Sequence, residues 1–180
     1  MLYVTGLALV AGAVVGLAFG GRPRFIAQHR LHQWWLVVVG FGLQVVADRV
    51  HQISVGTGLV LVGSVALLAF AALNPTLVGI GVVALGVASN ALVIGLNNGM
   101  PVHPPAVVAA HIAAADQLPV LNYGSRHREE RPGDKLRLLD DRIPLAPFRE
   151  VLSIGDLILA VGVAVTVSHL LRPRPLHARR

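Results

Sequence analysis

Residues 54–96, SVGTGLVLVGSVALLAFAALNPTLVGIGVVALGVASNALVIGL, decide the fold class. The stretch contains no charged residue, and only Asn74-Pro75 interrupts it, at a point where proline ends a helix. A helix needs roughly 20 mostly apolar residues to cross ~30 Å of hydrocarbon, and each half of the stretch meets that length. We therefore predict a tight hairpin of two membrane spans, residues 54–73 and 76–96.

Three further apolar segments flank this hairpin, at residues 2–20, 34–53 and 152–171. The whole chain is 54% hydrophobic and only 13% charged, which is more apolar than one soluble core requires. The first segment precedes basic residues instead of following them, the reverse of a signal peptide, so it is expected to be retained. We predict an all-α integral membrane protein with about five transmembrane helices in one membrane domain, residues 1–180.

Arginines set the expected orientation of these spans. Arg22, Arg24 and Arg30 follow the first span, and further arginines follow the last one, so both regions are expected on the cytoplasmic side. The amino terminus is then outside. A run of mixed charge at residues 126–135 is interpreted as a solvated turn within an outward polar loop, residues 119–151.

Residues 106–118 form a shorter apolar segment bounded by prolines on both sides. Thirteen helical residues reach only ~20 Å, so we predict a re-entrant or interfacial helix. The alternative is a sixth span that would send the carboxy-terminal tail outside. In the polar loop that follows, leucines and basic residues alternate over residues 135–138, which predicts a short strand or hairpin before Asp140.

Small residues recur at helical spacing in two of the spans. Gly12, Gly16 and Gly20 share one face of the first span, and the fourth span is similarly rich in glycine and alanine. Such faces let helices approach closely. We expect them to pack within the chain, with a homo-oligomer or another membrane protein as the alternative partner.

Composition excludes several classes of function. The net charge of +6 comes from residues at the ends of spans and in a mixed-charge loop, which favours anchoring over nucleic-acid binding. The chain has no cysteine, so thiolate chemistry is excluded. His103, His111 and Asp116 do not have the spacing of a metal site, and we predict neither a metal nor another cofactor.

Polar residues gather on one face of the second predicted span. Gln44, Asp48 and His51 are spaced at i, i+4 and i+7, so their side chains share a helical face that should turn away from lipid. This spacing predicts that Asp48 faces the bundle, near Asn90 or Asn97 of the fourth span. An interfacial carboxylate paired with its neighbour Arg49 is the alternative.

Three asparagines near the end of the fourth span complete this cluster. Asn90 and Asn97 lie on one face, and Asn98 follows where the helix should end. With Gln44 and Asp48 they predict a site at the outer membrane surface for a lipid headgroup, a small solute or a membrane partner. Hydrogen bonding between helices is the alternative for the first two, and helix termination is the alternative for Asn98.

Two carboxylates could carry catalysis. Asp141, with Asp140 beside it, lies in the outward loop, and Asp156 opens the last span. Two nearby carboxylates can share a proton and activate water. However, Ser153 lies three residues before Asp156, immediately ahead of an apolar run, and this is the pattern of a capping box that would give the carboxylate a structural role.

Two stretches, NALVIGLNNGMPV at residues 90–102 and LLDDRIPLAPFREVLSIGD at residues 138–156, resemble an uncharacterised family of small bacterial multi-pass membrane proteins, a domain of unknown function. The resemblance implies a location in the bacterial cell membrane and no activity. Our main hypothesis is accordingly a membrane protein that binds a ligand at its outer polar cluster, with membrane lipid as one partner.

A second, local likeness is to lipoprotein signal peptidases, which are intramembrane aspartyl enzymes. The segments LDDRI at residues 139–143 and SIGDLILAVGV at residues 153–163 are similar in order and setting to the two catalytic regions of that family. The likeness implies that Asp141 and Asp156 would be the catalytic pair. The chain departs from that family by an extra span and by lacking an Asn-x-x-Asp-Arg segment before LDDRI. An aspartyl hydrolase or peptidase at the membrane surface is thus the alternative function.

Overall fold

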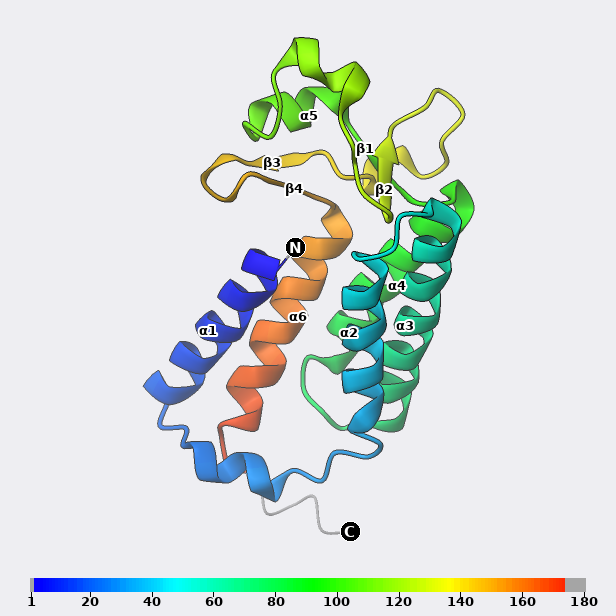
Figure 1. Cartoon of the computed structure of the whole chain (residues 1–180). Helices are drawn as coiled ribbons and strands as arrows, with labels where there is room; N and C mark the ends of the chain where they lie inside the picture. Colours follow the sequence, from blue (N-terminus) through cyan, green and yellow to red (C-terminus); the bar gives the residue numbers. More distant parts are fainter. Residues whose placement is uncertain (1, 174–180) are drawn as a thin grey trace.

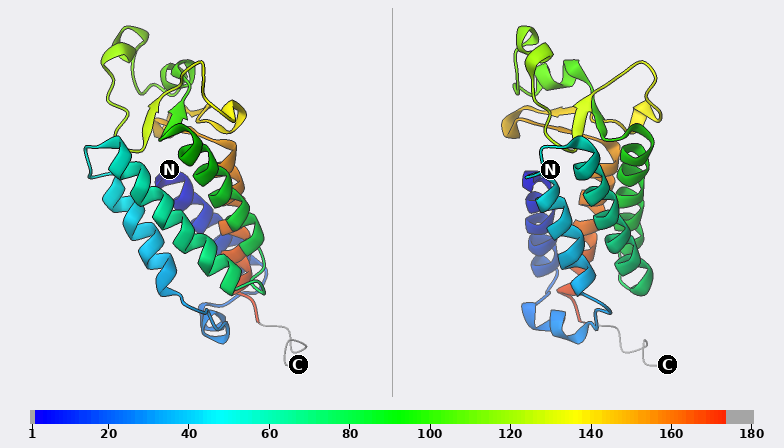
Figure 2. Two further views of the ribbon diagram at one scale, coloured as in Figure 1. Left: turned by 90° about the vertical axis from the view of Figure 1, so that its right-hand side faces the viewer. Right: turned by 45° about the vertical axis from the view of Figure 1, so that its right-hand side comes forward.

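Five long helices make up half of the computed structural model, which describes residues 2–173. They run side by side along one direction (Figure 1). Their bounds are α1 Leu2–Ala18, α2 Trp35–Ala47, α3 Ile53–Leu73, α4 Ile80–Asn97 and α6 Ile154–Leu170. A smaller region, residues 98–152, covers one end of the bundle, and we call it the cap (Figure 2).

The cap contains short elements only. They are β1 Met100–Val102, α5 Pro104–Ala109, β2 His127–Glu129, β3 Ile143–Leu145 and β4 Glu150–Leu152, with 3-10 turns at Ala115–Val120, Arg137–Leu139 and Ala146–Phe148. Strands β1 and β2 pair in parallel, and β3 and β4 form an antiparallel hairpin in which Ile143 lies opposite Leu152. The all-α prediction therefore holds for the bundle and not for the cap.

The helices pack as a series that does not follow their order in the sequence. Helix α1 packs on α6, α6 on α4, α4 on α3, and α3 on α2. In the described chain, α1 and α2 stand at the two ends of this series and are not among its closely packed pairs. The bundle is therefore an open arc, with α1 and α2 on either side of the opening.

Two helices, α3 and α4, are long and apolar enough to cross a membrane by length and composition. Helices α1, α2 and α6 are apolar but have only 17, 13 and 17 residues. The prediction of a span over residues 34–53 is wrong in its extent, because α2 ends at Ala47 and the next five residues turn into α3. Length alone therefore supports two of the five predicted spans.

The small-residue faces pack inside the chain, as predicted. A Cβ atom on Gly12 would lie 2.5 Å from the backbone oxygen of Ala164, and one on Gly16 would lie 2.9 Å from the side chain of Leu171. Gly20 does not belong to this face, since nothing lies within 4 Å of its Cβ position. Glycines thus bring α1 against α6.

Two predictions for the cap are wrong. Residues 106–118 do not form one helix: α5 ends at Ala109, because His111 takes a left-handed conformation with φ of 55°. At about 9 Å, α5 is too short for a sixth span. The expected strand at residues 135–138 is also absent; Leu136, with φ of 58°, instead begins a 3-10 turn.

Candidate functional site

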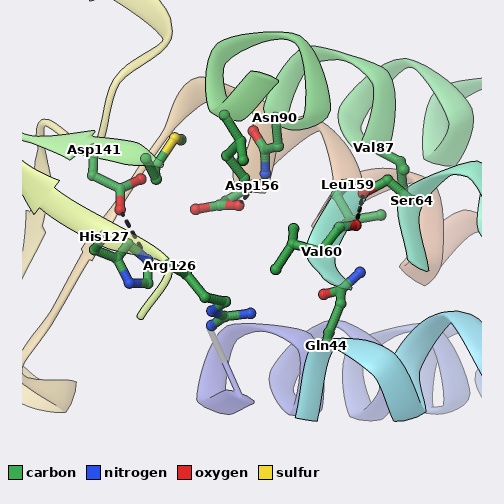
Figure 3. A pocket seen from close by; sticks show the side chains of 12 residues that line it. Gln44, Val60, Ser64, Val87, Asn90, Arg126, His127, Asp141, Asp156 and Leu159 are labelled. Carbon is green, nitrogen blue, oxygen red and sulfur yellow. Dashed lines mark hydrogen bonds and ion pairs between the residues drawn. The ribbon is translucent and has the colours of Figure 1, made fainter. Parts of the chain in front are cut away.

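A small cavity of about 50 Å³ lies where the cap meets the bundle. Four helices and two cap segments contribute polar side chains to its wall. We call it the polar pocket, and its charged or amide-bearing lining residues are Gln44, Asn90, Arg126, His127, Asp141 and Asp156 (Figure 3). Four of the eight residues predicted from the sequence thus meet here.

Asp156 is held by the start of α6. The Ser153 hydroxyl accepts a hydrogen bond from the Asp156 amide at 3.0 Å, and Oδ2 of Asp156 accepts one from the Ser153 amide at 3.1 Å. This reciprocal pair is the capping box predicted from the sequence, and it is confirmed. It fixes the carboxylate, which is only 4% exposed, at the wall of the polar pocket.

Asn90 of α4 extends this network across to α6. Its amide nitrogen donates to Oδ1 of Asp156 at 2.6 Å, and its amide oxygen accepts a hydrogen bond from the Ser153 hydroxyl at 3.0 Å. The contact requires glycine at position 155, where a Cβ atom would lie 1.9 Å from the Asn90 oxygen. Asn90 therefore does form the hydrogen bond between helices that was the alternative to a binding role.

Asp141 is positioned by the backbone of the cap. Its amide donates to the Pro101 oxygen at 3.0 Å, and its own carbonyl accepts from the His103 amide at 2.9 Å, which places it beside β1. The residue is 4% exposed, and within residues 2–173 its Oδ1 accepts no hydrogen bond. Burial, together with the nearby charge of Asp156, raises the pKa of Asp141 well above its ordinary value.

His127 is the nearest polar neighbour of Asp141. Its Nε2 lies 3.6 Å from Oδ2 of Asp141, which is too long for a direct hydrogen bond. Burial and the adjacent Arg126 charge lower the pKa of His127 to about 3, so the ring is neutral at pH 7. The histidine therefore supplies a polar wall without the positive charge that would keep Asp141 ionised.

The two aspartates consequently share one polar, poorly solvated space. In Figure 3 their carboxylates reach the pocket from different elements, Asp141 from the cap and Asp156 from α6. Two carboxylates in such a setting resist ionising together. This arrangement can donate a proton to one group while accepting a proton from another.

Arg126 connects this pocket to Asp48. Its Nε lies 2.8 Å from Oδ1 of Asp48, and its side chain is 15% exposed whereas that of Asp48 is 53% exposed. Asp48 lines the same cavity as Gln44, but its ion-pair partner is Arg126 and not the predicted Asn90 or Asn97. The carboxylate follows the last turn of α2, where the helix has already ended, and it pairs with Arg126 and not with Arg49.

The other predicted residues lie outside the polar pocket. His51 is exposed in the bend between α2 and α3. Asn97 is buried and binds the backbone of Lys135 in both directions at 2.9 Å, so it holds the cap loop on α4. Asn98, with φ of 53°, ends α4 in the left-handed conformation, as its helix-termination alternative requires.

Sequence analysis missed Arg126 and His127, which it placed in a solvated turn. The segment is in fact part of β2 and its approach, and Met100 of β1 lies opposite His127 in the parallel register. The partners of these two side chains are distant in sequence, since Asp48 precedes Arg126 by more than 70 residues. No local spacing could have indicated either contact.

A larger cavity opens beside the polar pocket, between α1 and α2. It has a volume of about 460 Å³ and a mostly apolar lining that includes Leu9, Phe41, Phe70 and Val163. We call it the apolar groove. It shares Gln44 and Arg126 with the polar pocket, so the two spaces adjoin.

A third cavity of about 220 Å³ lies within the cap and adjoins the polar pocket. Arg126, His127 and Asp141 line both spaces. Among residues 2–173, no group of three or more histidine, aspartate or glutamate side chains is placed to hold a metal ion.

Comparison with known proteins places the chain in a family without giving it an activity. Residues 28–168 match the family of unknown function DUF5317, and the chain belongs to that family. This confirms the resemblance to an uncharacterised family, and the match includes every residue of the polar pocket. No curated protein and no solved structure matches the chain.

Proposed function

We propose that this member of the DUF5317 family is a multi-span membrane protein that uses Asp141 and Asp156 to hydrolyse an amide or ester in a membrane-embedded substrate. The observation that carries the proposal is the meeting of both carboxylates in one small pocket at the cap end of an apolar bundle. Sequence reasoning ranked this function second. It now ranks first because the two aspartates, from separate elements, share that pocket.

We place all five long helices across the bacterial cell membrane, with the cap outside. Helix α2 has only 13 residues and would cross together with the turns at its two ends. Helices α3 and α4 are long enough to span alone, and the shorter α1 and α6 lie alongside them. Arg22, Arg24 and Arg30 lie at the end opposite the cap, where the positive-inside rule favours the cytoplasm. The polar pocket would then lie near the outer membrane surface.

The catalytic step uses one proton shared by the pair. Protonated Asp141 donates to the carbonyl oxygen of the substrate, while the Asp156 carboxylate takes a proton from water as the water oxygen attacks the carbonyl carbon. The resulting diol collapses when the bond to the leaving group breaks. One diol hydroxyl returns its proton to Asp141, and the leaving nitrogen or oxygen takes the proton from Asp156, so both residues regain their starting states.

The cavities around the pair suit such a substrate. The polar pocket, at about 50 Å³, has room for the attacking water. The apolar groove adjoins it and opens between α1 and α2, which gives the hydrophobic part of a membrane substrate a place beside the carboxylates. Arg126 lies where the two spaces meet and can contact a polar group of the same molecule.

Binding of an amphipathic lipid without chemistry is the second candidate. It is favoured by the network around Asp156, in which the capping box and Asn90 already occupy both oxygens of that carboxylate. In this case the apolar groove holds an acyl chain and Arg126 holds the headgroup. The two candidates differ in whether removing the proton-carrying ability of an aspartate abolishes function.

The test follows the oxygen of water into the products. Membranes containing the full chain are incubated in water enriched in ¹⁸O, and mass spectrometry then searches peptides and lipids for newly labelled carboxyl groups. We expect labelled products with the wild-type chain and a loss of about 10³-fold or more in Asp141→Asn and Asp156→Asn. Asp116→Asn is the matched control, because Asp116 is exposed in the cap and lines no part of the pocket.

Two results would overturn the proposal. One is the absence of any labelled product that depends on the wild-type chain. The other is full activity in a stably folded Asp156→Asn variant, since asparagine preserves the cap but cannot carry the proton. Retention of a phospholipid by the inactive chain would then favour the second candidate.

A further inference from the structure

We infer that a cavity at the end of the bundle opposite the cap binds the phosphate group of an anionic phospholipid. The cavity has a volume of about 550 Å³ and lies between the segment before α2, the α3–α4 connection and the end of α6. Its lining includes His29, Arg30, His169 and Arg172, and no acidic residue. We call it the basal pocket. The inference needs the membrane placement proposed above but not the hydrolytic chemistry.

The basal pocket lacks acidic side chains because the charges of this protein are segregated. All nine aspartate and glutamate residues fall between positions 48 and 156, in the cap or at the helix ends next to it. No aspartate or glutamate therefore lies at the opposite end to neutralise Arg30 and Arg172. An anion from outside the chain is the natural partner for such a cluster.

Arg172 is already positioned as an anion-binding side chain. Its guanidinium carbon lies 5.0 Å from the centre of the Phe19 ring, and one terminal nitrogen donates to the Ser168 hydroxyl at 3.3 Å. Its Nε is buried and donates to no acceptor in the described part of the chain. The guanidinium group lines the cavity without a carboxylate partner among residues 2–173, so a phosphate bound there can pair with it.

The position of the basal pocket favours a lipid over a free anion. Apolar side chains, Leu77 and Leu170 among them, line the same cavity as the arginines. The cavity also lies at the ends of apolar helices, which is the level of the headgroups if the bundle spans the membrane. A phospholipid can place its phosphate on the arginines and its glycerol and first methylenes against the leucines.

The test measures lipid binding by native mass spectrometry of the full chain in detergent micelles. Phosphatidylglycerol, phosphatidylcholine and inorganic phosphate are titrated separately. The double variant Arg30→Gln/Arg172→Gln is compared with Arg22→Gln/Arg24→Gln, which removes the same charge from the same end but from residues outside the pocket lining.

We expect phosphatidylglycerol to bind more tightly than phosphatidylcholine, and to bind the pocket variant about 25-fold more weakly, at about fivefold for each arginine. The control should lose less than about threefold. Equal losses in both variants would indicate diffuse attraction and overturn the inference, as would equal binding of the two lipids or displacement of the lipid by millimolar phosphate. If the double variant does not fold, the single variant Arg30→Gln tests the inference, and we expect it to bind phosphatidylglycerol about fivefold more weakly.

Discussion

The seam between α4 and α6 and the opening between α1 and α2 are built in opposite ways. In the seam, a Cβ atom on Gly86 would lie 2.6 Å from the backbone nitrogen of Leu159, so the two helices touch backbone to backbone. At the opening, α1 and α2 leave the apolar groove of about 460 Å³. The same chain thus closes one side of the bundle and leaves another side accessible.

The closely packed seam positions a side chain of the polar pocket, whereas the opening gives a ligand access to it. The seam carries the Asn90, Ser153 and Asp156 network at its cap end, so close helix packing fixes one carboxylate of the polar pocket. The opening is lined mainly by apolar side chains, which can contact a ligand. Substitutions in the seam should therefore alter folding, whereas substitutions at the opening should leave stability nearly unchanged.

The largest effect is expected for Gly86→Val, which places a branched side chain against the backbone of α6. Because backbone cannot move aside as a flexible side chain can, we expect a loss of about 3 kcal/mol or more in the free energy of unfolding. Gly81→Val is the matched control, since nothing lies within 4 Å of its Cβ position. Thermal unfolding in detergent compares the two, and equal stabilities would show that the seam is not closely packed.

Asn90→Ala is expected to cost about 2–3 kcal/mol. It removes the donor to Asp156 and the acceptor of the Ser153 hydroxyl, and it leaves a buried carboxylate with fewer partners. Ser89→Ala controls for the change on the same helix, because its hydroxyl binds only the carbonyl of Leu85 and should matter by less than about 0.5 kcal/mol. Chemical unfolding measures the stability of both variants. If both lose the same free energy of unfolding, the hydrogen-bond network does not stabilise the seam.

Asp140 provides a carboxylate that lacks the partners Asp156 has. It is buried, neither oxygen accepts a hydrogen bond from the residues described, and burial raises its pKa to about 6. In the unfolded chain the pKa of Asp140 is near its ordinary 3.8. Between about pH 4 and 6, the folded state therefore keeps Asp140 protonated while the unfolded state does not. Stability should fall as pH rises through this window, and the full penalty should persist above pH 6.

Asp140→Asn removes this ionisation. We therefore expect the variant to be more stable than the wild type by about 2 kcal/mol at pH 7, with the advantage shrinking toward zero as pH falls to 4. Melting temperatures of both chains, measured in steps from pH 4 to 7.5, check the trend. An advantage that does not change with pH would mean that Asp140 is not the group responsible.

Structural features that depend on neighbouring residues can be predicted from this sequence, whereas contacts between residues far apart in the chain cannot. The apolar run at residues 54–73 predicts α3, Ile53–Leu73, to within one residue, because its boundaries are set by nearby turn residues. Ser153 and Asp156 likewise predict their capping box, since both partners lie within one helical turn. These features depend only on neighbours in the chain.

The polar pocket could be predicted only in part. Gln44, Asn90 and Asp156 are polar residues in apolar segments, and Asp141 lies in the polar loop, but nothing local shows that the four meet. Their meeting depends on the parallel pairing of β1 and β2, which brings Arg126 and His127 over the bundle. His111, whose left-handed conformation ends α5, likewise has a distant partner, because its carbonyl accepts a hydrogen bond from Arg149 at 3.0 Å.

Asp48→Asn should have the smallest effect on stability, and it tests the opening between α1 and α2. The buried cluster expected from the sequence would make Asp48 important for folding, whereas the structure has it 53% exposed and paired with Arg126 beside the apolar groove. Exposed ion pairs contribute about 0–1 kcal/mol, so we expect a loss of about 0.5 kcal/mol, and a similarly small loss for Asp48→Leu. Thermal unfolding of both variants in detergent and in lipid bilayers measures this. A loss above about 2 kcal/mol for the leucine variant would mean that Asp48 turns into the bundle, and the opening between α1 and α2 would then have to be narrower than described. A small loss would leave Arg126 free to exchange Asp48 for a ligand at little cost in stability, as its position between the groove and the polar pocket requires.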